Sequence, residues 1–240
     1  MSEDKTLDEF LFKNGETEHY KTRFEGLLNG YGTLRKILRE QDKKEAEKYN
    51  LFDILNIESA ETKTHTPFLA NLLNTNGTHG QQNLFLTSFI NTFIPESKRN
   101  NFLLTNTNDY WIKEEHPFSD GRIDILIRAN NMDKKFGFIL EIKLNAGDQE
   151  NQITRYHTYL HSLGLQEHEM IIFYLTIDGK DPTAFSIDPE KLLELKEKNI
   201  FFNISYRKDI LGWLQNLLPQ IQARKVTEII KQYMDTIQTL

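Results

Sequence analysis

The spacing of apolar side chains divides the chain into a helical first part and a second part in which strands and helices alternate. Residues 17–48 contain no proline and are rich in Glu, Lys, Leu and Arg. Their apolar side chains recur at helical spacing, at Leu27, Tyr31, Leu34, Ile37 and Leu38. Glycines at positions 26, 30 and 32 interrupt this pattern, so the segment is expected to form one helix or two shorter ones.

Two more helices are expected before the strands begin. The first covers residues 58–73, with Pro67 in its first turn or at a kink. A polar loop at 74–80 ends it. The second covers residues 82–93 and stops before Pro95. The chain therefore opens with a helical layer.

From residue 110 the apolar pattern is typical of strands. Strands are expected at 110–118, 123–127, 136–144, 170–177 and 200–206, and the polar segment 129–135 is expected to connect the second and third as a hairpin. Helices are expected at 148–163, 190–198, 208–218 and 224–237. This order predicts one mixed α/β domain with helices at both ends.

Two carboxylates stand in strands that are otherwise apolar. Asp124 lies within the sequence RIDILI, and Glu141 lies near the end of FGFILEIKL. Strand alternation places Glu141 and Lys143 on one face. A hairpin symmetric about residues 132 and 133 pairs 128 with 137, 126 with 139 and 124 with 141, so the two carboxylates would face each other.

Two facing carboxylates repel each other, so this arrangement requires a group that offsets the repulsion. A shared proton, the ammonium of Lys143 or a divalent cation would each provide it. Mg²⁺ binds one or two carboxylates and keeps its other positions for water and phosphate. The alternative is that Glu141 and Lys143 are ordinary solvent-facing charges on a strand.

The sequences GRIDILI, FILEIK and LNAGDQENQITRYHTYL together resemble the PD-(D/E)xK nuclease superfamily, in its bacterial nuclease-like branch. Asp124 matches the Asp of the family's second core strand, and Glu141 and Lys143 match its Glu-x-Lys. Upstream, ETKTHTPFLANLLNTNGTHGQQNLFLTSFI resembles the first helices of that branch. The likeness spans about residues 53–162. The motif departs from the family only in that Ile123, not proline, precedes Asp124.

The resemblance implies a restriction-endonuclease-like αβββαβ core with a mixed central sheet and additional N- and C-terminal helices. The core would cover residues 56–206, with a helical extension at 1–55 and C-terminal helices at 207–240. It also implies Mg²⁺-dependent hydrolysis of phosphodiester bonds, with Mn²⁺ as a substitute. Asp124 and Glu141 would bind the metal, and Lys143 would orient water or stabilise charge on the phosphate.

Four further side chains are candidates for the site. Glu61, four residues before His65, would supply the helix carboxylate, with Glu58 as the alternative. Gln152, Arg155 and Tyr156 share one helix stripe with Tyr159. Gln152 would contact a phosphate or a metal-bound water and Arg155 a backbone phosphate, while Tyr156 would either contact substrate or pack in the core. His65 is expected to pack behind the site, and His79 to organise its loop.

Composition narrows the functional classes. The 240 residues include no cysteine, which excludes disulfides, thiolate catalysis and cysteine-zinc sites. The N-terminus is unlike a secretory signal, so the cytoplasm is the expected location. The net charge of −6 is unlike that of a generally basic DNA-binding protein.

Two functions remain in competition. The first is a metal-dependent nuclease acting on DNA in defence or repair, as a homodimer or with a defence-system partner protein. The second is a catalytically inactive relative that binds nucleic acid or regulates. The net charge favours the second, whereas the intact Asp124, Glu141 and Lys143 favour the first.

Overall fold

The computed structural model describes residues 16–46, 48–106, 109–129 and 134–240. Contacts divide the chain into two units, Met1–Tyr49 and Asn50–Leu240. The described part of the first unit is helix α2 (Glu16–Glu45) with the few residues after it. The helix continues through all three glycines, so of the two forms expected for this segment, the single helix is found.

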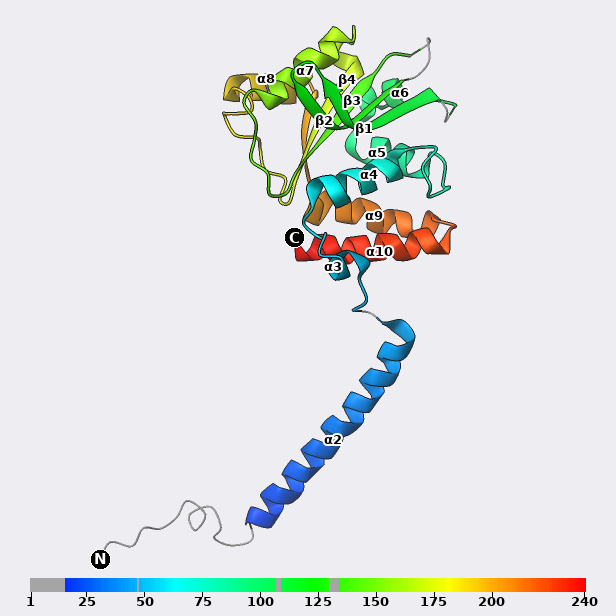
Figure 1. Ribbon diagram of the computed structural model, residues 1–240, viewed down its shortest axis with the longest axis vertical. Coiled ribbons are helices and arrows are strands. Elements are labelled where there is room, and N and C mark those ends of the chain that lie inside the picture. Colours follow the sequence, from blue (N-terminus) through cyan, green and yellow to red (C-terminus); the bar gives the residue numbers. More distant parts are fainter. Residues whose placement is uncertain (1–15, 47, 107–108, 130–133) are drawn as a thin grey trace, which may run out of the picture. The chain divides into compact units, whose positions relative to one another are not determined.

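The second unit is built on a five-stranded mixed sheet (Figure 1). Its strands lie in the order of the sequence, namely β1 (Tyr110–Phe118), β2 (Gly121–Ala129), β3 (Gly137–Lys143), β4 (Met170–Thr176) and β5 (Phe201–Ser205). The first three pair antiparallel, and β3, β4 and β5 pair parallel. With the helix before β1 and the crossover helix between β3 and β4, this is the predicted restriction-endonuclease-like αβββαβ core with one added strand.

A large helical layer covers one face of the sheet (Figure 1). It consists of α3 (Leu51–Ile54), α4 (Thr66–Leu73), α5 (Leu84–Phe93), α6 (Glu96–Phe102), α9 (Leu211–Leu217) and α10 (Arg224–Thr239). Alternate strand residues such as Phe138 and Phe173 point into this layer and contact Phe89 of α5. Burial of these large aromatic side chains is a main source of the fold's stability.

Two helices cover the opposite face, α7 (Gln152–Ser162) and α8 (Pro189–Glu197). Leu160 of α7 packs on Ile139 and Ile172 of the sheet in a second apolar cluster. Gly137 allows this close approach, because a Cβ atom there would lie 2.9 Å from Leu165 and 3.1 Å from Leu160. Position 137 therefore has no room for a larger side chain unless those leucines move.

The main strands and helices agree with the sequence prediction to within a few residues. The helix expected over 58–73 differs at its start, where η1 (Glu61–His65) is a π-helical turn that leads into α4. The short helices α3 and α6 were not predicted. Residues 130–133 of the expected hairpin connection lie outside the described residues.

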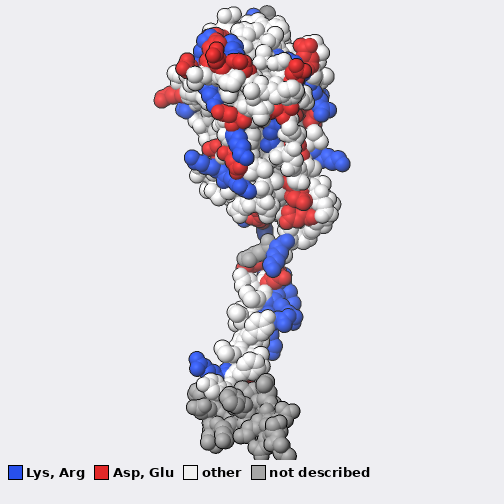
Figure 2. Space-filling model, turned by 90° about the vertical axis from the view of Figure 1, so that its left-hand side faces the viewer, with Lys and Arg blue, Asp and Glu red and all other residues white. Residues whose placement is uncertain are grey.

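Charges of both signs are mixed on the face of the second unit that Figure 2 shows. Figure 2 shows Lys and Arg next to Asp and Glu over the visible face, with no large area of one sign. Among the residues that the structure describes, no helix combines the length and apolar character needed to cross a membrane.

Candidate active site

Strands β2 and β3 separate before either of them ends. Their pairing includes Arg128 with Gly137 and Leu126 with Ile139, which confirms the predicted register, and it stops at Ile125 with Leu140. Before residue 125, β2 pairs only with β1, and after residue 140, β3 pairs only with β4. The two strands thus form a fork, and the expected pair 124 and 141 lies at its base.

Where the backbone pairing of β2 and β3 stops, the side chain of Asp124 provides the next contact between the two strands. Its Oδ2 accepts a hydrogen bond of 2.8 Å from the backbone N–H of Ile142. Its Oδ1 accepts none from the residues that the structure describes. One oxygen of this carboxylate therefore fixes the base of the fork, while the other is available to a ligand.

A cavity of about 410 Å³ lies in the fork. The three residues of the predicted catalytic motif line it together with two of the further candidates, Glu61 and Gln152. The lining comprises Glu61, Thr62, Gly121, Arg122, Asp124, Glu141, Ile142, Lys143, Ala146, Gln149 and Gln152.

Three donors hold the carboxylate of Glu141, which is only 2% exposed. Oε1 accepts hydrogen bonds from Gln152 Nε2 at 2.6 Å and from Lys143 Nζ at 2.9 Å. Oε2 accepts one from the Tyr156 hydroxyl at 2.7 Å. These contacts compensate for the burial of a charged group and fix its orientation.

Burial and mutual repulsion raise the pKa values of both carboxyl groups. Burial, followed by the charge of Glu141, raises the pKa of Asp124 to about 8. Burial also raises the pKa of Glu141, against the opposing effect of Lys143. Burial disfavours the ammonium of Lys143, but the acidic groups around it, Glu141 first and then Asp124 and Glu61, together outweigh burial and raise the pKa of Lys143. Lys143 thus stays charged, while the acidic pair is prone to hold a proton.

Helix α7 presents its first turn to the site. Asn151, in a left-handed conformation with φ of 51°, turns the chain into the helix. Gln152 and Tyr156 follow one turn apart on the same face, and Gln152 Nε2 also lies 3.0 Å from the Tyr156 hydroxyl. Tyr156 is only 1% exposed, so it combines core packing with a hydrogen bond to Glu141.

Arg155 lies beside the cavity rather than on Asp124 or Glu141. Its guanidinium donates to the backbone oxygen of Asp120 and, at 3.0 Å, to Gln149 Oε1. It lines an open hollow next to Gln149, a residue that also lines the fork cavity. Arg155 therefore places a positive charge next to the fork cavity.

Glu61 binds the backbone that follows Lys143. Its Oε1 accepts hydrogen bonds from the N–H groups of Leu144 at 2.7 Å, Asn145 at 2.6 Å and Ala146 at 2.9 Å. Glu58 does not line the cavity, and its Oε2 is buried with no hydrogen-bond partner among the described residues. Of the two candidates, the structure brings Glu61 to the site.

The comparisons with known proteins agree with this geometry. Residues 49–235 match the sequence profile of the PD-(D/E)XK nuclease superfamily. The chain belongs to this superfamily. No curated protein and no solved structure matches the chain.

Members of the PD-(D/E)XK superfamily are generally nucleases that use divalent metal ions such as Mg²⁺. In this member the fork fits such an ion by its donor chemistry, because two carboxylates line one cavity and Asp124 keeps an oxygen available. The described residues contain no cluster of three or more acidic or histidine side chains arranged for metal binding. Two carboxylates, with water and phosphate completing the shell, are the donor set that remains.

The two histidines of the upstream motif lie where they were expected. His65 is fully buried behind the site, with Nδ1 at 2.9 Å from the Tyr233 hydroxyl and Nε2 at 2.9 Å from the Glu58 carbonyl. Burial lowers its pKa, so it is neutral at pH 7. His79 organises its own loop through Asn74 O and the N–H of Gln81, at 2.9 Å each.

Sequence reasoning missed two acidic residues near the site. Glu115 has a φ of 49° at the only break within the β1–β2 pairing, opposite Asp124, and forms an ion pair with Arg122. Asp148 accepts hydrogen bonds of 2.7 Å from the hydroxyls of Tyr174 and Thr183. For Glu115, neither spacing nor residue type gave a signal, because the break depends on how the two strands meet. Asp148 could have been suspected from its position between the Glu-x-Lys motif and helix α7.

Proposed function

We propose that this PD-(D/E)XK protein is a metal-dependent nuclease that hydrolyses phosphodiester bonds of DNA. The observation that carries the proposal is the fork, in which Asp124, Glu141 and Lys143 line one cavity. The first two are acidic and prone to protonation without a cation, and the third is a charged ammonium. Two carboxylates can bind a cation, and the cation and the ammonium can together bind an anionic phosphate.

Asp124 and Glu141 would hold Mg²⁺, or Mn²⁺ in its place. A bound divalent ion supplies Lewis-acid charge to the phosphate and lowers the pKa of a coordinated water. In the overall reaction, water adds to phosphorus, the P–O bond to the leaving oxygen breaks, and that oxygen takes up a proton.

The remaining residues have roles that follow from their contacts. The ammonium of Lys143 would stabilise negative charge on the phosphate and orient the attacking water. Gln152 and Tyr156 would act through Glu141 as positioning residues, because both donate hydrogen bonds to its carboxylate. Arg155 would bind a flanking phosphate of the substrate backbone.

Glu61 would be a positioning residue as well. Three backbone N–H groups already occupy its Oε1, and they belong to the segment directly after Lys143. Its negative charge also lies close enough to raise the pKa of Lys143, after the larger effects of burial, Glu141 and Asp124. The role of completing the metal site as a third carboxylate is the alternative.

The test is a cleavage assay with purified full-length protein. Supercoiled plasmid, linear duplex DNA, single-stranded DNA and RNA are each incubated with Mg²⁺, Mn²⁺ or EDTA. The wild type, Asp124→Ala and Lys143→Ala are compared with Asp235→Asn, which changes an exposed acidic residue of α10. Metal-dependent cleavage by the wild type and Asp235→Asn alone supports the proposal, and equal cleavage by all four proteins contradicts it. Cleavage of RNA but not DNA would retain the nuclease and reject DNA as the substrate.

A catalytically inactive nucleic-acid-binding or regulatory protein is the second candidate. The net charge of −6 provides little general attraction for DNA, which weakens the nuclease proposal and favours the regulatory form of this candidate. Binding to DNA without cleavage in either metal would establish it. A role in defence or repair would follow only from demonstrated action on DNA.

A further inference from the structure

Helix α2 carries a row of large apolar side chains that are all exposed. Eight of them are between 53% and 67% exposed, namely Tyr20, Phe24, Leu27, Leu28, Tyr31, Leu34, Ile37 and Leu38. All side chains from Tyr20 to Ala46 are exposed. Figure 2 shows that much of the visible side of this helix carries no charge. Soluble proteins rarely leave a continuous apolar surface of this length uncovered.

The helix also contains three interior residues that weaken it. Gly26, Gly30 and Gly32 lie in its interior with no neighbouring atom within 4 Å of a Cβ at any of the three positions. Glycine destabilises a helix interior, and most helix stability in proteins comes from packing of an apolar face. A partner that covers the row would supply that packing.

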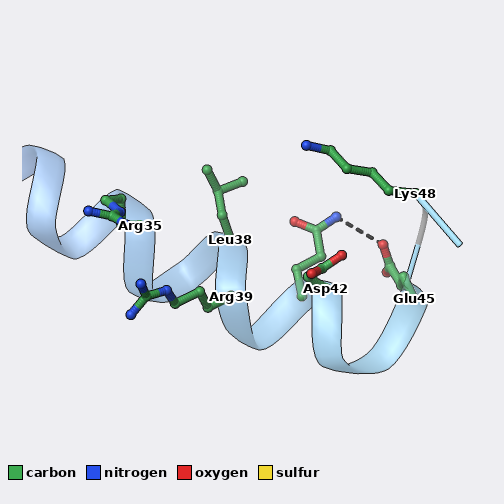
Figure 3. Close-up of a pocket in the computed structure, with 7 residues that line it drawn as sticks. Arg35, Leu38, Arg39, Asp42, Glu45 and Lys48 are labelled. Atoms are coloured by element: carbon green, nitrogen blue, oxygen red, sulfur yellow. Dashed lines mark hydrogen bonds between the residues drawn. The ribbon is translucent and has the colours of Figure 1, made fainter.

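The spacing of the row identifies the kind of partner. Six residues alternate at intervals of four and three, at Tyr20, Phe24, Leu27, Tyr31, Leu34 and Leu38. These are the d and a positions of a heptad repeat, which gives a narrow seam with a period of 3.5 residues. Such a seam packs against another helix of the same period in a coiled coil. The glutamine and glutamate at the next two seam positions, Gln41 and Glu45, hydrogen bond to each other at 2.9 Å and end the row (Figure 3).

We propose that α2 pairs with α2 of a second copy of this chain in a parallel two-stranded coiled coil. A second copy is the partner because it carries the same period and length in register. If each of the six seam residues buries roughly 100 Å², the pair buries on the order of 1,200 Å² in total, which is the lower end of specific interfaces.

Flanking charges select the parallel orientation. In that arrangement the positions beside the six-residue row pair Arg23 with Leu28, Gly30 with Arg35, and Ile37 with Asp42, so no like charges meet beside the row. In the antiparallel arrangement that overlaps the two rows fully, Lys21 would face Arg35 of the second copy. The hollow of about 390 Å³ along α2 between Arg35 and Lys48 is lined by side chains of this segment alone, including Leu38 at the end of the row (Figure 3).

The first experiment measures the mass of the full chain in solution. Light scattering after size exclusion is expected to give twice the 28.3 kDa of one chain for the wild type and 28.3 kDa for Leu27→Glu/Leu34→Glu. The matched control is Lys36→Glu, which lies on the opposite side of the same helix and should remain dimeric. A monomeric wild type, or a dimer that survives Leu27→Glu/Leu34→Glu, overturns the proposal. Thermal unfolding of each variant reports whether the second unit remains folded.

The second experiment tests the pairing residue by residue, using the absence of native cysteine. In a parallel seam, Leu34→Cys places two thiols across the interface, within reach of a disulfide. Mild oxidation should then yield about tenfold more covalent dimer for Leu34→Cys than for Lys36→Cys. Equal yields from the two variants, or none from Leu34→Cys, overturn the parallel pairing. Neither experiment depends on nuclease activity.

Discussion

The backbone N–H of Ile142 donates a 2.8 Å hydrogen bond to Oδ2 of Asp124 where β2 and β3 stop pairing. The carboxylate therefore has two separable tasks. One oxygen holds the backbone, and in the proposed mechanism the negative charge would bind the metal ion.

Asp124→Asn should separate these tasks. The amide oxygen can still accept the Ile142 N–H, so the thermal unfolding temperature should remain close to that of the wild type. Metal-dependent cleavage should fall by at least about 100-fold, because the amide is a weaker metal ligand and carries no charge. Asp124→Ala should lose both activity and stability. If Asp124→Asn cleaves DNA at the wild-type rate, Asp124 does not act in the reaction.

Loss of the Lys143 ammonium should destabilise the fold in a pH-dependent way. Lys143→Met leaves Glu141 buried with only Gln152 and Tyr156 as donors. At pH 8 the unpaired charge should lower the free energy of unfolding by about 3 kcal/mol. At pH 5 the loss should be smaller, because Glu141, whose pKa is already raised, takes up a proton. Denaturant unfolding at both pH values measures this, with Lys208→Met as an exposed control; an equal loss at both would contradict the account.

Without metal, the protein should become less stable as pH rises. Asp124 has a pKa of about 8 in the folded chain against an ordinary 3.8. Between these values the folded state holds a proton that the unfolded state has released. The free energy of unfolding therefore falls with rising pH, by up to about 1.4 kcal/mol per pH unit from this one group.

Two comparisons isolate that effect. Asp124→Asn cannot titrate at this position, so its stability should vary less between pH 5 and pH 8, and identical slopes would refute the assignment. Mg²⁺ should raise the unfolding temperature more at pH 8 than at pH 5, because metal binding requires ionised carboxylates. This stabilisation should be absent from Asp124→Ala.

Substitutions of Glu61 distinguish positioning from metal binding. Glu61→Gln retains an oxygen for the N–H groups of residues 144–146 and should keep activity within about threefold of the wild type. Glu61→Ala removes the acceptor and should lower activity by at least about tenfold. Equal inactivation by both substitutions would instead assign a role to the negative charge. Cleavage rates at saturating Mg²⁺ provide the measurement.

Tyr156→Phe should change the pH dependence of cleavage. The hydroxyl donates a 2.7 Å hydrogen bond to Glu141, which favours the ionised carboxylate. Its removal should raise the pKa of Glu141 and move the acid limb of the pH–rate profile upward by about half to one pH unit. The ring still fills its place in the core, so the fold should be kept. An unchanged acid limb would mean that the hydroxyl does not tune Glu141.

The sequence contained enough information for the fold and for the centre of the candidate site. Apolar runs located the strands, and the symmetric hairpin gave the register that brings position 124 to position 141. The side-chain pattern of α7 placed Gln152 and Tyr156 on one face. These features are local or follow from strand periodicity, which is why they could be derived.

Other features depend on contacts that spacing does not encode. The strand fork arises because β2 and β3 each continue with a different neighbour. The three N–H groups bound by Glu61 come from a loop more than 80 residues away in sequence. The left-handed conformation of Glu115 exists only in the context of the neighbouring strand. Each of these requires the folded backbone.

The opening between β2 and β3 is set by the pairing of each strand with its outer neighbour and by the hydrogen bond from Ile142 to the side chain at position 124. Substitutions that abolish chemistry can leave its shape intact, since the strands are held apart by their outer neighbours. Asp124→Asn should therefore still bind the nucleic acid that the wild type is proposed to cleave. That makes it a reagent for capturing the natural target of this protein from a mixture of nucleic acids.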